Sequence, residues 1–245
     1  MNVNVTYIEH SGFLLEWEEA YWLFDYYKGD LPDFDGKKRL LVFVSHRHDD
    51  HFNPEIFNLY KKHSNIRYFI SSDIKLDDNN MSKYGITKEL ASLIQIVKPN
   101  QEYLPNNTDD IVINTLKSTD IGVAFLIKYK GKTIYHAGDL NLWVWKGEDK
   151  QFNNNMRAIF IKEIDKLNNV NIDLAFAPLD PRQEEWYGLG IDELLSRAKI
   201  NYLFPMHFWQ QPKIIKKFKK EREDKQLTAK IIDIEHKGQI FNIDI

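Results

Sequence analysis

The stretch that decides the fold is LLVFVSHRHDDHFNP, residues 40–54. It opens with an unbroken run of apolar, β-prone residues, which is typical of a strand covered on both faces. The run ends in SHRHDDH, which places three of the chain's eight histidines and two aspartates within six residues. Pro54 then predicts the start of a helix, since proline is favoured at the first helical position. Side chains that bind metals are therefore gathered at the end of a predicted buried strand.

The spacing of the residues within this motif is suited to metal binding. His46 and His48 are two residues apart, so in extended backbone their side chains point the same way. Both imidazoles can then reach one ion at the ~2.0–2.1 Å typical of zinc–nitrogen bonds. Asp50 and His51 follow where the chain turns into the helix, so they can address a second point nearby.

Two later segments also end predicted strands with such side chains. Asp139 closes YHAGD after the strand KTIY, and His207 lies in PMHF after NYLF. Because strand ends can converge on one rim, we expect these two residues to complete a site for one or two ions. The chain has no cysteine, so the ligands must be His, Asp or Glu. Such nitrogen and oxygen ligands suit Zn²⁺, Mn²⁺ or Fe²⁺.

Composition narrows the class of protein. With 245 residues, of which 43% are hydrophobic, the chain can form a sizeable core as one large domain or as two small ones packed closely, and we expect a single domain over residues 1–245. A formal net charge of −3 argues against a dedicated nucleic-acid binder. The N-terminus predicts no signal peptide, and no apolar run approaches the ~18 residues that span a bilayer. We expect a cytoplasmic protein with a small-molecule substrate and no membrane partner; the sequence leaves a homo-oligomer open.

The pattern of elements indicates a layered α/β domain in which helices cover a pair of sheets. YKGK predicts a hairpin turn, and AKIIDI and GQIFNIDI predict a pair of strands that closes the chain. The predicted helices are 54–63, 151–168, 191–198 and 212–223.

These motifs resemble a known family. SHRHDDH is similar to the H-x-H-x-D-H signature of the metallo-β-lactamase superfamily, YHAGD to its Gly-Asp motif and PMHF to its last histidine motif. The order and spacing agree over nearly the whole chain. HSGF near the N-terminus and IYHAGDLN resemble the compact branch that includes ascorbate-6-phosphate lactonase-like proteins. The resemblance implies a four-layer αββα sandwich, with the site at one edge between its sheets and Asp139 bridging two metals.

One departure from the family pattern matters. The superfamily usually has a further histidine ligand between the first motif and the Gly-Asp motif, and here TLKSTDIGVAF contains none. Asp120 could substitute, although Ser-Thr-Asp is also ordinary turn chemistry. His10, in HSGF, could fill the gap, donate a proton or contact the substrate, or be a hydrogen-bonded histidine at a strand end.

Other residues are candidates around this site. The resemblance gives Asp50 the role of orienting the attacking water and accepting its proton. Arg182 in LDPR could hold an anionic substrate group, and Asp180 could orient a ligand histidine. Trp143 could line a pocket. The alternatives are a plain loop for Asp180 and Arg182 and simple packing for Trp143.

The leading hypothesis is a metal-dependent hydrolase, with zinc as the expected metal. Its substrate would be a small ester, lactone, amide or phosphoester metabolite, and the substrate could carry an anionic group. A nuclease of the same superfamily is a second hypothesis, weakened by the absence of a basic surplus. A metal-binding sensor without catalysis is a third. A diiron oxygen- or nitric-oxide-reducing role is disfavoured, because those relatives typically have Glu where this chain has His48.

Overall fold

The computed structural model describes residues 1–105, 110–225 and 227–245. The chain forms two compact units, one made of Met1–Lys98 with His236–Ile245 and the other of Pro99–Glu235. Among the described residues, each unit holds one mixed sheet of seven strands. The predicted α/β fold with two sheets is therefore confirmed, whereas the single domain over 1–245 stays a prediction.

The sheet of the first unit joins both ends of the chain. Its strand order is β14-β1-β2-β3-β4-β5-β6. The pairs from β14 to β3 are antiparallel, and those from β3 to β6 are parallel. The strands are β1 (Asn2–Glu9), β2 (Gly12–Glu16), β3 (Ala20–Phe24), β4 (Arg39–Val44), β5 (Ile66–Ser71), β6 (Ile94–Val97) and β14 (Ile240–Asp244).

Strand β4 lies inside this sheet and is buried on both faces, which explains its unbroken apolar sequence. On one face Val42 and Val44 pack in a core that includes Ile56 and Phe57. On the other face Phe43 stacks on an aromatic ring from each neighbouring strand. The ligand motif therefore begins on a rigid, fully packed strand.

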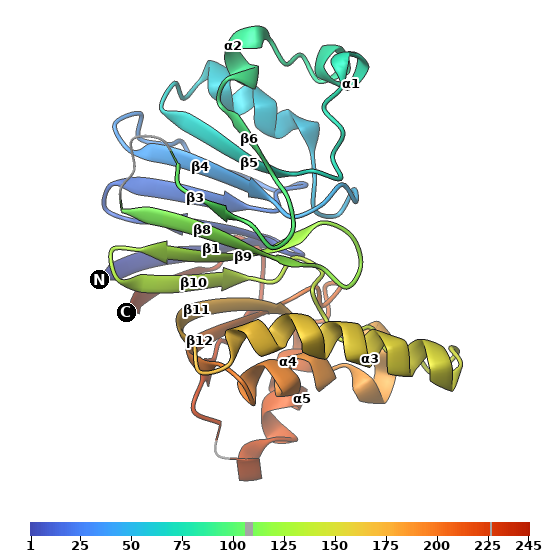
Figure 1. Ribbon diagram of the computed structural model, residues 1–245. Helices are drawn as coiled ribbons and strands as arrows, with labels where there is room; N and C mark the ends of the chain where they lie inside the picture. Colours follow the sequence, from blue (N-terminus) through green and yellow to red (C-terminus); the bar gives the residue numbers. More distant parts are fainter. Residues whose placement is uncertain (106–109, 226) are drawn as a thin grey trace. The chain divides into compact units, whose positions relative to one another are not determined.

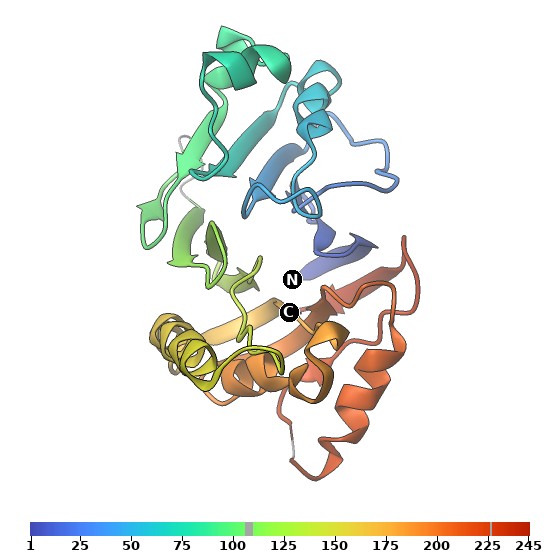
Figure 2. The same ribbon diagram turned by 90° about the vertical axis from the view of Figure 1, so that its right-hand side faces the viewer.

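The helical segments of the first unit are short. They are η1 (Pro54–Lys61), α1 (Asp78–Lys83) and α2 (Lys88–Ala91), and they lie on one face of the sheet (Figures 1 and 2). The helix expected at 54–63 is present as the 3₁₀ helix η1. Its first turn is closed tightly, because the Asn53 side chain accepts from the Glu55 amide and Pro54 occupies the first position.

The sheet of the second unit has the strand order β13-β12-β11-β10-β9-β8-β7. Strands β10 to β13 are parallel, and β7 to β10 are antiparallel. The predicted YKGK turn is confirmed, since it joins β9 to β10 with Lys132 opposite Tyr129. The strands are β7 (Glu102–Tyr103), β8 (Ile111–Lys117), β9 (Val123–Tyr129), β10 (Lys132–His136), β11 (Asn171–Pro178), β12 (Lys199–Met206) and β13 (Lys230–Ile231).

Helices connect the parallel strands of this sheet, as parallel pairing requires. Figure 1 shows α3, α4 and α5 together on one face of the sheet. Asp149 caps α3 by accepting from the Phe152 amide. The segments are α3 (Lys150–Ile164), η2 (Asp165–Leu167), η3 (Pro181–Trp186), α4 (Leu189–Leu195), α5 (Lys213–Lys220) and η4 (Glu223–Lys225). No helix in the described ranges is both long and apolar enough to cross a membrane.

The expected pairing of the last two strands is wrong. β13 lies parallel to β12 in the second unit, while β14 lies antiparallel to β1 in the first. Both segments are β-prone, but residues 236–239 carry the chain from one unit to the other, and Tyr7 bonds Gly238 and Gln239 through its backbone. Each segment therefore completes the edge of a different sheet instead of pairing with the other.

Candidate functional site

Four candidate ligands lie in the turn that follows β4. This first ligand set is His46, His48, Asp50 and His51, and the side chains of His46 and His51 are fully buried. Nε2 of His46 lies 3.1 Å from Nδ1 of His48. Two nitrogens bound tetrahedrally to one zinc ion at about 2.1 Å lie about 3.4 Å apart, so this pair fits a shared cation.

A buried carboxylate orients His51. Asp25 follows β3, is fully buried and has its Oδ2 atom 2.8 Å from Nδ1 of His51. A carboxylate in this position holds the proton on Nδ1, which leaves the lone pair of Nε2 available for a metal.

The same carboxylate orients His46 through a serine. Ser45 donates its hydroxyl to Oδ2 of Asp25 at 2.6 Å and its amide to Oδ1 at 2.7 Å. A hydroxyl has one proton, so at the 2.9 Å contact with Nδ1 of His46 the serine oxygen accepts. His46 therefore keeps its proton on Nδ1 and presents Nε2 as an acceptor, which is the form a metal requires.

His10 lies beside Asp50 within the first unit. The chain adopts a left-handed conformation at His10, with φ 57°, and the Tyr7 hydroxyl accepts its amide hydrogen at 2.9 Å. Nε2 of His10 lies 3.3 Å from Oδ2 of Asp50. The side chain of Asp50 is 30% exposed, whereas that of His10 is 4% exposed. A buried imidazole and a water-accessible carboxylate at this distance can pass a proton between them.

The second unit carries a second ligand set, made of Asp120, Asp139 and His207. Nε2 of His207 lies 3.4 Å from Oδ1 of Asp139. A carboxylate oxygen of Asp120 lies within 4.8 Å of one from Asp139. Asp120 is exposed, and its amide donates to the hydroxyl of Ser118. Two carboxylates this close repel each other unless a cation or proton lies between them, which is consistent with a metal-binding role.

A second buried carboxylate orients His207. Asp180 accepts from Nδ1 of His207 at 2.9 Å, from the Arg182 guanidinium and from the indole of Trp209 at 3.1 Å. Burial raises the pKa of Asp180, but the hydrogen bonds from His207 and Arg182 outweigh it and lower that pKa to about 2. Asp180 is therefore ionised at neutral pH and keeps the proton of His207 on Nδ1, as Asp25 does for His51.

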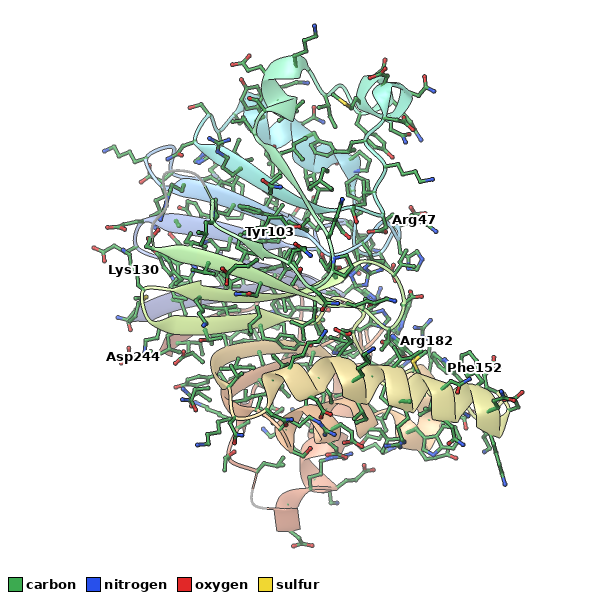
Figure 3. All side chains as sticks on the ribbon, in the orientation of Figure 1. Arg47, Tyr103, Lys130, Phe152, Arg182 and Asp244 are labelled. Atoms are coloured by element: carbon green, nitrogen blue, oxygen red, sulfur yellow. The ribbon has the colours of Figure 1, made fainter. Side chains whose placement is uncertain are left out.

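Arg182 lies at the end of the second unit's strands opposite to Lys130, which occupies the β9–β10 turn (Figure 3). Its Nε atom lies 3.0 and 2.9 Å from the two oxygens of Asp180, and its guanidinium carbon lies 4.4 Å from the Trp209 ring centre. The guanidinium of Arg182 is therefore held firmly in place. Its side chain remains 48% exposed, so it can still meet a ligand.

Trp143 is 7% exposed, and its indole donates to the backbone carbonyl of Asp139 at 2.9 Å. Its ring lies 5.4 Å from that of His207 and 5.9 Å from that of Trp145. Trp143 therefore braces the backbone and ring of two candidate ligands, and little of its surface is left for a substrate. Gly138, at φ 50°, allows the tight turn that brings Asp139 to this position.

The sequence analysis did not identify three residues that orient the candidate ligands or their partners, namely Asp25, Ser45 and Trp209. Asp25 directly follows the apolar strand YWLF, and an acid at a buried strand end is the one signal that could have found it. Ser45 and Trp209 carry no such signal in the sequence.

A family described as "Beta-lactamase superfamily domain" matches residues 4–156, more than half of the chain. A protein of Opitutus terrae named "UPF0173 metal-dependent hydrolase" is 25% identical over 234 residues, which cover 86% of this chain and 87% of that protein. Each is a protein or family that this chain resembles in sequence.

Solved structures of similar fold have lower sequence identity and show the fold alone. Igni18, a metallo hydrolase from Ignicoccus hospitalis, superposes with a TM-score of 0.68 at 19% identity, covering 100% of both chains. CmlA, a diiron β-hydroxylase from Streptomyces venezuelae, gives 0.62 at 11% identity, covering 99% of this chain and 54% of that one. Since the family match spans more than half of the chain, this protein belongs to the β-lactamase superfamily, as the SHRHDDH motif indicated.

Proposed function

We propose that this protein is a metal-dependent hydrolase of a small ester, lactone, amide or phosphoester. The observation that carries the proposal is the pair of buried carboxylate–histidine contacts, Asp25 with His51 and Asp180 with His207. Each fixes an imidazole in the tautomer that binds a metal, and each does so without exposure to water. Any buried histidine needs one hydrogen-bond partner, but here the other ring nitrogen also lies among candidate ligands, as Nε2 of His207 does 3.4 Å from Asp139.

We propose that each ligand set binds a divalent ion. The motifs that supply them occur together in the superfamily that the sequence resembles. In the first unit His46, His48 and His51 would bind an ion through imidazole nitrogens, and in the second unit Asp120, Asp139 and His207 would offer carboxylate and imidazole donors. Nitrogen and oxygen donors without thiolate favour Zn²⁺, with Mn²⁺ or Fe²⁺ as alternatives. When bound, such an ion activates water at neutral pH and polarises the substrate's carbonyl or phosphoryl oxygen.

The protein's own residues would direct the protons. Asp50 is the one carboxylate of the first ligand set and is partly exposed, so it can orient the attacking water and accept its proton. His10, at 3.3 Å, can take that proton from Asp50 and deliver it to the leaving group. Asp120 fills the place of the family's missing histidine, and Arg182 offers its exposed face to a substrate.

The relatives support the coarse class only. The Opitutus terrae protein carries the name of a metal-dependent hydrolase and is aligned over most of both chains. The fold of CmlA, which is named a β-hydroxylase, illustrates that the same architecture supports other chemistry. The proposal therefore rests on the ligand chemistry of this chain.

The test is a metal analysis combined with a substrate panel. Purified protein is loaded with Zn²⁺, Mn²⁺ or Fe²⁺, and turnover is measured on p-nitrophenyl esters, lactones, amides and bis(p-nitrophenyl) phosphate. We expect metal-dependent turnover that a chelator abolishes. Asp50→Ala should lower kcat at least about 100-fold, the scale of lost general-base catalysis. Asp139→Ala should also lower kcat, because it removes a proposed metal ligand. Exposed Asp33→Ala is the matched control and should behave as wild type.

Other outcomes would contradict the proposal. Tight metal binding without turnover of any substrate favours a sensor. Turnover restricted to phosphodiesters, with binding that weakens steeply as salt rises, favours a nuclease. Full activity in both Asp50→Ala and Asp139→Ala would show that the proposed metal centre does not carry the reaction.

A further inference from the structure

A pocket lies directly beside the ligand turn of the first unit. It is lined by Arg47, Asp49 and Phe52 of that turn and by side chains of the segment 73–84, and its volume is about 590 Å³. Pockets for small molecules usually measure about 300–1,000 Å³, so this one has the size of a metabolite site.

The lining combines an apolar floor with a cationic rim. Phe52 and Ile74 are 7% and 4% exposed, and Tyr84 is half-buried beside them. Lys75 and Lys83 are exposed at the rim. This arrangement suits a ligand with a small carbon skeleton and a charged group.

The cations of the rim have no carboxylate partner in the part of the chain that the structure describes. Among the described residues, Arg47, Lys75 and Lys83 make no ion pair; Lys83 only lies 5.6 Å from the ring of Tyr84. Elsewhere in the unit the half-buried Lys38 is paired with Glu16 at 2.7 Å.

The two acids of the pocket do not cancel this charge. Asp73 accepts the amide hydrogen of Arg47 at 2.9 Å, which ties one of its oxygens to the backbone of the ligand turn. Three cations (Arg47, Lys75, Lys83) against two carboxylates (Asp49, Asp73) leave a net charge of +1. A ligand anion is therefore attracted to the rim.

The pocket adjoins the candidate metal ligands along the chain. Arg47 lies between His46 and His48, and Phe52 follows His51. Consecutive Cα atoms are about 3.8 Å apart, so a molecule in the pocket touches residues next to the ligands. An acyl or phosphoryl compound held here would have its anionic end fixed while its other end lies beside the reacting groups.

We propose that this pocket binds the anionic end of the substrate, a carboxylate or phosphate group on a small carbon skeleton, through Arg47, Lys75 and Lys83. The proposal rests on the proposed hydrolase function and adds the substrate class to it. Lys75 and Lys83 are substrate-binding residues in this assignment, and their removal acts on the preference for anions.

The first test compares two esters that differ in charge. Metal-loaded protein is assayed with p-nitrophenyl acetate, which is neutral, and p-nitrophenyl hydrogen succinate, whose acyl group ends in a carboxylate. We expect wild type to favour the succinate ester and the double variant Lys75→Gln/Lys83→Gln to reduce that preference in kcat/KM at least tenfold. The matched control is Lys37→Gln/Lys220→Gln, which removes two exposed lysines outside the pocket lining and should keep the preference.

The second test identifies the anion. Succinate and inorganic phosphate are compared as competitive inhibitors of wild type and of Lys75→Gln/Lys83→Gln. We expect the preferred anion to inhibit wild type more strongly than the other. Its inhibition constant should rise about tenfold in the variant, which tells whether the pocket prefers a carboxylate or a phosphate. Equal inhibition constants in both proteins would mean that the anion binds the metal alone, which overturns the proposal.

The two proposals fail in different ways. If esters are hydrolysed but charge preference is the same in wild type and the lysine variant, the hydrolase stands and the pocket assignment is wrong. If no substrate is hydrolysed, calorimetry of succinate and phosphate binding to the metal-loaded protein tests the pocket assignment on its own. Binding that Lys75→Gln/Lys83→Gln weakens tenfold keeps the anion pocket without the hydrolase, and unchanged or absent binding removes the pocket as well.

Discussion

Oδ2 of Asp25 lies 2.8 Å from Nδ1 of His51, and both side chains are fully buried. The same oxygen accepts the hydroxyl of Ser45, which in turn contacts His46. One carboxylate therefore determines the tautomer of two candidate ligands. Because that carboxylate is far from water, its removal leaves ring nitrogens without a fixed proton position.

We predict that Asp25→Ala weakens metal binding 10- to 100-fold, the usual effect of losing such an orienting group. Competition with a chromogenic chelator measures the affinity. Asp25→Asn is the matched control, because its amide oxygen can still accept from His51, and it should lose less. Wild-type affinity in a folded Asp25→Ala protein would show that the carboxylate has no orienting role.

We predict a similar loss for Asp180→Ala in the second unit. Its pKa of about 2 keeps the carboxylate charged at every pH at which the protein would be assayed, so the contact with His207 persists. Metal affinity should fall 10- to 100-fold. Arg182→Gln keeps Asp180 and should change metal affinity less than about threefold. An equal loss in both variants would mean that Arg182, and not the carboxylate, positions His207.

The gap left by the family's missing histidine can be tested at Asp120. We expect Asp120→Ala to lower the number of bound ions or their affinity about tenfold, since an oxygen ligand is lost. Asp120→His should preserve or raise zinc affinity, because imidazole is the family's usual donor. Elemental analysis with chelator competition gives both quantities. Normal zinc binding in Asp120→Ala, together with a loss in His10→Ala, would assign the missing ligand to His10.

The first sheet should depend on its aromatic ladder. Phe43 is fully buried and stacks on Phe24 and Phe69, its register partners on the neighbouring strands, with ring centres 4.7 and 5.0 Å apart. Phe43→Ala should lower the free energy of unfolding by about 3–5 kcal/mol, measured by urea denaturation. Ile240→Ala, at a side chain that is 61% exposed, should cost less than about 0.5 kcal/mol. A small effect of Phe43→Ala would show that the cavity collapses.

The contact between Glu16 and Lys38 predicts a dependence of stability on pH. The hydrogen bond from Lys38 lowers the pKa of Glu16 below its ordinary value of 4.5. The carboxylate therefore stabilises the fold above about pH 4.5, and this contribution disappears as the pH falls through the lower folded pKa. Glu16→Gln should reduce the free energy of unfolding at pH 7 by at most about 1 kcal/mol, with the difference vanishing in acid.

Thermal or urea unfolding of Glu16→Gln across this pH range makes the comparison. Glu18→Gln, at an exposed neighbour, is the control and should show no such trend. A difference that grows as the pH falls would contradict the assignment.

Local sequence was a good guide where local physics decides the structure. The run LLVFV predicts a strand buried on both faces, and β4 is one. The YKGK turn and the helix start at Pro54 follow from local backbone preferences. Both predictions are confirmed, since YKGK joins β9 to β10 and Pro54 begins η1. The error at the last two strands, β13 and β14, arose because β propensity does not say which partner a strand will find.

The amino-acid sequence by itself pointed to the candidate ligands, the strands that carry them and the family, since His46, His48, Asp50 and His51 lie within six positions. Only the tertiary structure decided what holds and surrounds them. Asp25 meets His51 and Asp180 meets His207 at separations of 26 and 27 positions along the chain, because parallel strands bring their carboxyl ends to the same edge of a sheet. The pocket beside the ligand turn likewise unites residues 47–52 with 73–84, a contact that depends on the pairing of β4 with β5 and that no local pattern contains.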